Sequence, residues 1–313
     1  MSKVIDFFAR RTRQAAPASL SPAARIAETI QGFSIEVMPR TAAKIDSFAE
    51  ILPAGSRIYI AHIDGTPIEE MVETARRITD EGFEAMPHFP ARSIPSKAAL
   101  ADWIARYQGE AGVSSALLLG GGVTQPRGEF HCSMQLMESG LFDAAGFARL
   151  HVAGHPEGNK DIDADGSEAN VMAALKWKQA FSERTDAKMA IATQFVFEPG
   201  PVVAWAARLR EADVDLPIHV GVAGPAKLQT LIKYALTCGV GPSVQVLQKR
   251  AADVTKLMLP FTPDRVLADI AAAKLADPAL QIEQVHFFPL GGIGKTAEYV
   301  AEAGATGRAA AYA

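Results

Sequence analysis

Residues 57–89 read RIYIAHIDGTPIEEMVETARRITDEGFEAMPHF, and this stretch contains one complete strand–helix–strand unit. The apolar runs at 57–63 and 83–89 have the length of buried strands, and the residues between them repeat their apolar side chains with helical period. Thr66, Pro67 and Glu69 predict the start of this helix as an N-cap, a first-turn proline and a capping box, and the helix is expected to reach Glu81. Parallel strands joined by a helix are the unit of α/β folds.

The same alternation continues on both sides of this stretch. Several of the candidate strands are apolar throughout, as expected for strands that are covered on both faces. Eight β/α alternations predict a single (β/α)8 TIM barrel. A doubly wound open sheet is the alternative, but it would need a glycine fingerprint after its first strand, where residues 36–39 read EVMP. The strand candidates are residues 33–38, 57–63, 83–89, 114–119, 150–154, 189–197, 217–222 and 284–288.

The segments between the strands carry helix signals. Ser96 is expected to cap a helix over 97–108, and a helix over 167–183 should turn Leu175 and Phe181 inward. Gly224 and Pro225 should open a helix over 226–237 that Gly239 closes. Between the seventh and eighth strands, helices predicted over 244–258 and 262–276 form a helical insertion. Residues 1–31 are predicted to be an N-terminal helical extension, with a short amphipathic helix over 1–14, and residues 32–313 the catalytic barrel domain.

Composition narrows the class of protein. Of 313 residues, 49% are hydrophobic and 21% charged, which is an ordinary globular balance. Lysine plus arginine number 31 and aspartate plus glutamate 35, and the resulting net charge of −4 disfavours nucleic acid and anionic membranes as partners. No apolar run approaches the ~18 residues of a membrane span. Cys132 and Cys238 have no metal-ligand spacing around them and are interpreted as reduced thiols of a cytoplasmic protein.

Polar residues stand at the predicted carboxyl ends of the strands, where barrel enzymes build their active sites. Glu36, between Ile35 and Val37, is expected to be a partly desolvated carboxyl of raised pKa, which is the profile of a general acid. A structural ion pair is the alternative for Glu36. A GGG turn at 120–122 either admits a ligand close to the backbone or is a simple tight turn. Histidines also follow several strands, but no metal site is predicted.

Taken together, these segments resemble the methylenetetrahydrofolate reductase family, from about Phe33 to Gly292. Residues 34–41 (SIEVMPRT) are similar to the family's opening strand SFEFFPPRT, minus one proline. Four further segments match in order: EAMPH at 84–88, VAGHPEG at 152–158 (similar to VAGYPEG), LKWK at 175–178 and ATQFVFE at 192–198 (similar to ITQFFFD/E).

The resemblance implies a flavin-containing barrel that reduces 5,10-methylenetetrahydrofolate to 5-methyltetrahydrofolate, with NAD(P)H as hydride donor and bound FAD. Glu36 falls on the general acid that assists opening of the folate ring. Gln194 and Tyr234 fall on folate-binding positions. The positions implied for cofactor binding are His62, His88, Leu119, Gly120, Gly121, His155, Glu157, Asn159 and Lys178.

The sequence also departs from the family pattern. The turn after the fourth strand, often LRGD, reads LLGG at 118–121, with neither the arginine nor the acid; Asp64 and Glu129 are candidates for the missing acid by position alone. A family tyrosine is His155, a family histidine is Asn159, and a threonine–tyrosine pair is Ala61-His62. Two alternatives therefore stay open: direct hydride transfer from nicotinamide to folate without flavin, and a non-catalytic folate-binding barrel. Assembly into a homo-oligomer is also left open.

Overall fold

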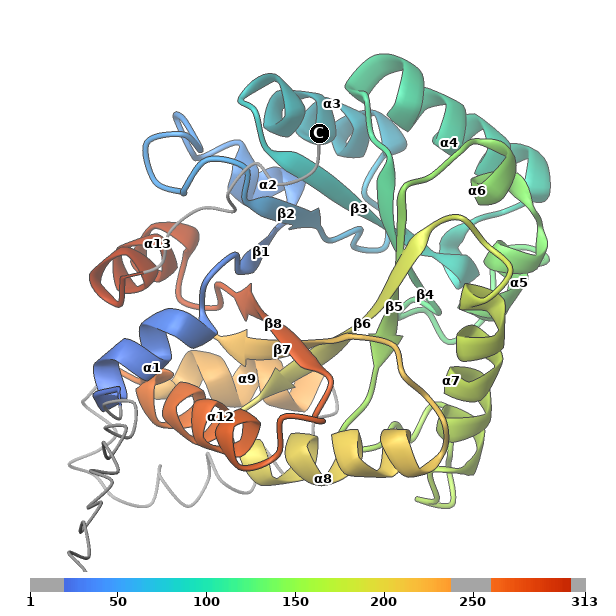
Figure 1. Ribbon diagram of the computed structural model, residues 1–313. Helices are drawn as coiled ribbons and strands as arrows, with labels where there is room; N and C mark the ends of the chain where they lie inside the picture. The colour runs from blue at the N-terminus through green and yellow to red at the C-terminus, as the bar shows by residue number, and fades with distance from the viewer. Residues whose placement is uncertain (1–19, 238–259, 305–313) are drawn as a thin grey trace, which may run out of the picture.

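The computed structural model describes residues 20–237 and 260–304, which form a closed barrel of eight parallel strands in chain order (Figure 1). Each predicted strand run overlaps one of these strands, with ends that differ by up to three residues, so the predicted single (β/α)8 barrel is confirmed. The strands are β1 Ser34–Val37, β2 Arg57–Ile60, β3 Glu84–Pro90, β4 Ser115–Leu119, β5 Arg149–Gly154, β6 Lys188–Val196, β7 Ile218–Ala223 and β8 Ile282–Phe288.

A ring of helices covers the outside of the barrel (Figure 1). Outward strand residues such as Ile35, Val37 and Ile58 pack against it in one continuous apolar core. None of the helices formed by residues 20–237 and 260–304 combines the length and the hydrophobicity that a bilayer crossing requires. The helices are α1 Pro22–Thr29, α2 Pro39–Ala42, α3 Ile68–Asp80, the 3-10 turn η1 Ala91–Ser93, α4 Lys97–Ala111, α5 Ser133–Glu138, α6 Leu141–Ala144, α7 Ala169–Ser182, α8 Pro199–Glu211, α9 Leu228–Thr237, α12 Asp264–Ala276 and α13 Ile293–Glu302.

The helix boundaries follow local signals with small differences from the prediction. Ser96 caps α4 as predicted, since its Oγ accepts a hydrogen bond from Ala99 N at 3.1 Å, and α4 runs on to Gly112, whose φ of 61° ends it. The predicted Thr66 cap is wrong: Pro67 occupies the N-cap of α3, and no side chain caps that end. In α7, Leu175 and Phe181 are buried as predicted.

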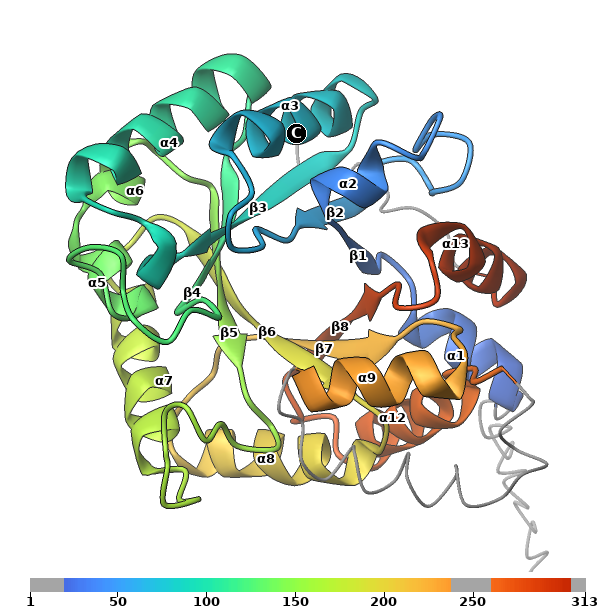
Figure 2. The same cartoon turned by 180° about the vertical axis from the view of Figure 1, so that it is seen from behind.

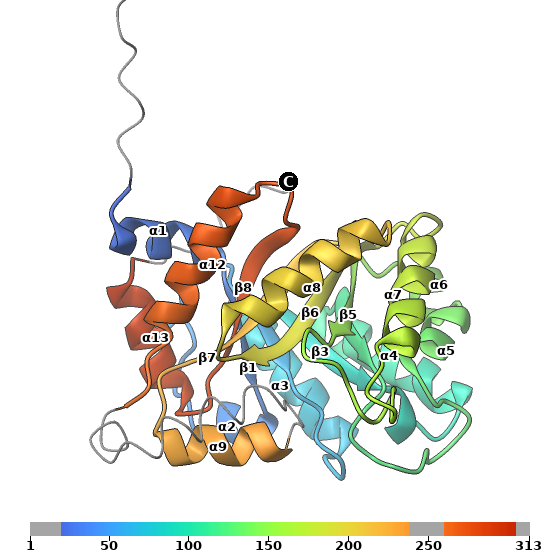
Figure 3. The ribbon, with the colours of Figure 1, turned by 90° about the horizontal axis from the view of Figure 1, so that it is seen from below.

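The segment between β7 and β8 contains two described helices. α12 lies in the outer ring, where it packs beside α8 and against α1. α9 lies at the end of the barrel where α2 follows β1, which is the carboxyl end of the strands (Figures 2 and 3). The inserted helix is therefore α9, because α12 occupies the ordinary crossover position. The helices predicted over 1–14 and 244–258, together with Cys238 and Gly239, lie outside the described residues.

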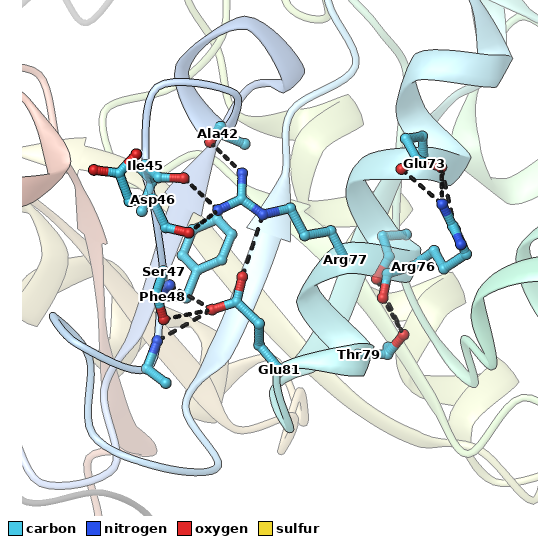
Figure 4. Close-up of polar contacts among 12 residues, drawn as sticks. Ala42, Ile45, Asp46, Ser47, Phe48, Glu73, Arg76, Arg77, Thr79 and Glu81 are labelled. Atoms are coloured by element: carbon cyan, nitrogen blue, oxygen red, sulfur yellow. Dashed lines mark hydrogen bonds and ion pairs between the residues drawn. The ribbon is translucent and has the colours of Figure 1, made fainter.

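A charged pair at the end of α3 fixes the long connection from α2 to β2 (Figure 4). Arg77 donates to the carbonyls of Ala42 (2.9 Å), Asp46 (3.0 Å) and Ile45, and pairs with Glu81 at 3.2 Å. Glu81 in turn accepts from the backbone N–H of Phe48 at 2.5 Å. Buried backbone groups need such partners. This pair holds the first part of the connection, residues 42–49, against the end of α3.

Candidate active site

The inside of the barrel carries several polar side chains beside the apolar Met86 and Leu117, whereas barrels of this fold are usually filled by branched apolar side chains. Tyr59, His151, His219 and His286 point inward and are each 2% exposed or less. The Tyr59 hydroxyl and His151 Nδ1 are 2.6 Å apart, and His219 Nε2 lies 2.9 Å from Glu283 Oε2 near the amino-terminal end. These side chains form a hydrogen-bonded floor beneath the mouth of the barrel, the end at which the strands finish.

Glu36 lies above this floor, on the inward face of β1. Its Oε2 atom is 3.3 Å from His88 Nε2 on β3 and 3.9 Å from His286 Nε2 on β8. His286 is held from the other side, because its Nδ1 is 2.9 Å from the hydroxyl of Ser34, its register partner on β1. Glu36, His88 and His286 are called the Glu36 group below.

The pKa predicted for Glu36 is wrong in direction. Burial, the largest single influence, raises this pKa, but the hydrogen bonds and charges of His286 and His88 outweigh it and lower the pKa from 4.5 to about 2. The prediction treated Ile35 and Val37 as an apolar environment for the carboxyl group. Both side chains instead point out of the barrel into the apolar core, away from Glu36. Glu36 is therefore an ionised carboxylate at neutral pH. Burial also lowers the pKa of His286, against the opposing hydrogen bond and charge of Glu36.

A second group of predicted residues meets at the carboxyl ends of β5 and β6. His155 makes a side-chain hydrogen bond with Gln194 and receives one from Asn159 Nδ2 at 3.3 Å. Burial, followed by the nearby charge of Lys178, lowers the pKa of His155 to about 4 against the opposing hydrogen bond of Gln194. Four residues predicted separately are thus brought together, and the His155 ring is neutral there. His155, Gln194 and Lys178 are called the Lys178 group below.

Lys178 supplies the buried charge of the second group. Its side chain comes from α7 and is 6% exposed, and burial lowers its pKa to about 8. Its ammonium makes no hydrogen bond or ion pair with any of the residues 20–237 and 260–304; the thiol of Cys132 is the one group that favours its charge. A buried ammonium without a partner is unfavourable in the free protein and suits a phosphate or another anion.

A β-bulge aims Gln194 into the mouth. The register between β6 and β7 shifts between Ala192 and Phe195, and Thr193 Oγ1 accepts the Gly221 N–H at 2.8 Å. A Cβ atom at Gly221 would lie 2.5 Å from the Thr193 carbonyl oxygen and 2.6 Å from that of Gln194. Bulges of this kind re-aim a side chain next to a site, and only glycine leaves room for this one.

Replacing Gly221 by alanine is expected to lower the free energy of unfolding by about 1–3 kcal/mol, because backbone must move to admit the methyl group. The matched control is Gly109→Ala in α4, where a Cβ meets nothing within 4 Å and the change should stabilise by roughly 0.5–1 kcal/mol. Denaturant unfolding of both variants measures the difference. Equal stability of Gly221→Ala and wild type would show that the bulge is not as tightly packed as described.

The glycine turn after β4 is closed by an arginine from another element. Arg92, in η1, donates from its backbone N to Gly120 O at 2.9 Å and from Nη2 to Gly121 O at 2.6 Å. The same Nη2 meets Asp161 at 2.5 Å. Leu119 ends β4 and packs on the barrel floor. The sequence of this turn lacks the arginine and the acid of the LRGD pattern. In the structure Arg92 contacts the turn, and Asp161 contacts Arg92.

Neither of the two acids suggested by position is directed at that turn. Asp64 pairs with Arg127 at 2.8 Å, and Glu129 accepts the Lys97 N–H at 2.5 Å at the start of α4. Both therefore have structural partners of their own, and the acid that the structure brings beside this turn, through Arg92, is Asp161. No local pattern marks it, because its partner Arg92 lies far away in the chain.

Three other predicted residues stand apart from both groups. His62 points away from the barrel axis, stacks on Trp103 of α4 at 5.0 Å and has Nε2 3.1 Å from the Thr66 carbonyl. Tyr234 lies half-buried on α9, packed against the apolar cluster around Phe195 and Phe261. Glu157 is half-buried in the turn after β5. His62 and Tyr234 thus border the mouth from two sides without contacting the Glu36 group.

The two groups lie across the mouth from each other. The strand order places β5 and β6 opposite β1 in the closed barrel. Beside the Glu36 strand, the loops after β1 and β2 line a groove of about 390 Å³ that includes Met38, Arg40 and Ile63. In the part of the chain that the structure describes, no three His, Cys, Asp or Glu side chains are arranged to hold a metal ion.

The fold and the site together define a (β/α)8 barrel in which a carboxylate–histidine group faces a buried, unpaired ammonium across the mouth. Such an arrangement can move a proton on one side and hold an anionic group on the other. A scan against models of known protein families gives no match for this chain. The function therefore rests on the site residues.

Proposed function

We propose that this protein reduces 5,10-methylenetetrahydrofolate to 5-methyltetrahydrofolate with NAD(P)H. The observation that carries the proposal is the pairing of the Glu36 group with the Lys178 group at one barrel mouth. Residues that the resemblance assigns to proton transfer (Glu36) and to folate and cofactor binding (Gln194, His155 and Lys178) are assembled there from β1, β6, the turn after β5, and α7.

The chemistry of this reaction needs a proton and a hydride at neighbouring atoms. The methylene carbon becomes electrophilic when its bond to one folate nitrogen breaks, and that nitrogen leaves more easily if it is protonated as the bond opens. Proton transfer from a positioned side chain contributes typically ~10²–10⁴-fold. The Glu36 group supplies titratable side chains for this step, and Gln194 offers both a donor and an acceptor to a planar pterin.

The fit of a flavin can be judged from the same residues. Lys178 would hold a phosphate of FAD, and His155 would border the ring system. When bound, FAD would accept hydride from NAD(P)H and pass it to the folate. The turn at Gly120 and Gly121 is less favourable, because Arg92 already occupies its carbonyl groups. That occupation favours the second candidate, direct hydride transfer from NAD(P)H to the folate, in which Lys178 holds the nicotinamide cofactor's phosphates.

The test uses the full chain, purified from a flavin-sufficient host. Its visible spectrum reports bound flavin, and formation of 5-methyltetrahydrofolate is followed with NADH or NADPH, with and without added FAD. Turnover with a yellow protein supports the flavin route, and turnover with a colourless protein that takes up no FAD supports direct transfer. Folate binding without any turnover would overturn the proposal in favour of a non-catalytic folate-binding barrel.

A further inference from the structure

Ser34 lies on the same face of β1 as Glu36, one layer deeper in the barrel. The two residues are two positions apart on a strand, so both side chains point inward. Ser34 is completely buried, and its Oγ is 2.9 Å from Nδ1 of His286, its register partner on β8. Within residues 20–237 and 260–304, the Ser34 hydroxyl makes no second hydrogen bond. This hydroxyl is thus dedicated to one nitrogen of the His286 ring.

The contact with Ser34 selects the ring nitrogen of His286 that carries the proton. Burial, against the hydrogen bond and charge of Glu36, lowers the pKa of His286 from 6.5, so above neutral pH the ring carries a single proton. If that proton were on Nδ1, Ser34 Oγ would accept it, and the proton of the hydroxyl would be left buried without an acceptor. An unpaired buried donor is unfavourable. The hydroxyl therefore donates to Nδ1, which places the ring proton on Nε2.

The Nε2 side of the ring faces Glu36. Its distance to Oε2 is 3.9 Å, and long contacts of this kind often tighten when a substrate binds. The ring is packed between Tyr59 and Phe288, with ring centroids 4.3 Å and 4.7 Å away. An N–H group at Nε2 stabilises the carboxylate form of Glu36, whereas a lone pair at Nε2 would accept a hydrogen bond from the protonated form. The tautomer of His286 therefore biases the proton on Glu36.

We propose that Ser34 is a positioning residue, whose hydroxyl holds His286 in the Nε2–H tautomer and thereby sets how readily Glu36 takes up a proton. This inference rests on the proposed function. There Glu36 takes up a proton and gives it to the folate nitrogen as the bond from that nitrogen to the methylene carbon breaks. The electron pair of the bond stays on the nitrogen, and the hydride of NAD(P)H goes to the carbon. Ser34 acts on this step only through His286.

The other titratable groups around Glu36 remain when the Ser34 hydroxyl is removed. His88 on β3 lies 3.3 Å from the same Oε2 atom, and its hydrogen bond and charge also lower the pKa of Glu36. On β2, Tyr59 is the register partner of Glu36, and the charge of Arg57 opposes a charged His286 ring. A change at Glu36 on removal of the hydroxyl therefore reports the tautomer of His286.

The test compares wild type with Ser34→Ala and with the control Ser115→Ala. Ser115 is a buried serine at the start of β4 whose Oγ donates to Glu84 at 2.8 Å, so each variant loses one buried hydroxyl and its hydrogen bond. In ¹⁵N NMR at pH 8, the proton of His286 should be on Nε2 in wild type and in Ser115→Ala. Ser34→Ala should show a mixture of the two tautomers.

The proton on Glu36 is followed in the same three proteins. Its ¹³C carboxyl signal, titrated downward from pH 6, should begin to move about one pH unit higher in Ser34→Ala than in the other two, which is the size of one hydrogen bond. In folate reduction, the alkaline fall of kcat, which reports the donor in the enzyme–substrate complex, should begin about one pH unit higher in Ser34→Ala.

Two results would overturn the role of Ser34, and neither depends on folate turnover. One is a wild-type His286 ring with a proton on Nδ1 at pH 8. The other is a Glu36 titration in Ser34→Ala that coincides with wild type or that Ser115→Ala shifts equally. If Ser34→Ala does not fold, the ¹⁵N spectrum of wild type decides alone. A wild type that reduces no folate ends the proposed function, whereas the spectra still decide whether Ser34 controls the proton on Glu36.

Discussion

Replacing Glu36 by glutamine is expected to slow folate reduction by about 10²–10⁴-fold, the usual contribution of proton transfer by a positioned group. Glutamine keeps the shape of the side chain but has no titratable proton, so the loss measures what the carboxyl group of Glu36 contributes to the proton transfer. Single-turnover kinetics with NAD(P)H measure it. The affinity for NAD(P)H should change little, since Glu36 lies across the mouth from Lys178.

The same variant has a second expected effect that does not depend on the substrate. The folded-state pKa of Glu36, about 2, is below its ordinary 4.5, so the carboxylate stabilises the fold above pH ~4.5. That contribution, about 3 kcal/mol at 1.36 kcal/mol for each pKa unit, is lost as pH falls towards 2. The stability of wild type and of Glu36→Gln should therefore differ at neutral pH and converge near pH 2.

The exposed Glu50 gives a matched control, because Glu50→Gln should change neither the rate nor the acid limb of stability. A Glu36→Gln protein that reduces folate within a few-fold of wild type would make Glu36 a structural residue. Equal stability of wild type and Glu36→Gln at every pH would instead show that the contacts of the carboxylate with His88 and His286 are weaker than their distances suggest.

Replacing Lys178 by methionine should stabilise the protein and weaken cofactor binding at the same time. The folded-state pKa of Lys178, about 8, is below its ordinary 10.5, so its ammonium destabilises the fold below pH ~8 and the effect vanishes as pH rises through 10.5. Methionine removes a penalty of about 3 kcal/mol at pH 7. It also removes a charged contact worth about 1.5–3 kcal/mol, which weakens binding of a phosphate-bearing cofactor roughly 10–100-fold.

Denaturant unfolding measures the change in stability. Titration with FAD, or with NAD(P)H if the protein takes up no flavin, measures the change in cofactor affinity. Lys176→Met is the control on the same helix, because Lys176 is exposed and should change neither. A gain in stability without a loss of affinity would mean that Lys178 serves no anion. A loss of stability would mean that the ammonium has a partner after all.

The sequence by itself determined the barrel. Apolar runs of strand length alternate with segments of helical period, and this spacing is a local property that each unit carries within about 30 residues, as residues 57–89 show. Placing Glu36, His88, His155 and Gln194 at the mouth follows from the same reasoning, since all parallel strands of a barrel end on one side. The sequence determines the position of a helix N-cap less well, because moving the cap by one residue, as from Thr66 to Pro67, hardly changes the periodic pattern of apolar residues.

Only the tertiary structure decided what these residues do to one another. The pKa of Glu36 is set by β3 and β8 and not by its neighbours in the chain, and the acid at the β4 turn is Asp161, brought there by Arg92. The burial of Lys178 depends on how α7 packs into the apolar core around the barrel, where its neighbours Leu175 and Phe181 are also buried. Electrostatic interactions act through space and depend on burial, so a sequence that places each residue on a strand end still leaves the sign of its pKa shift open.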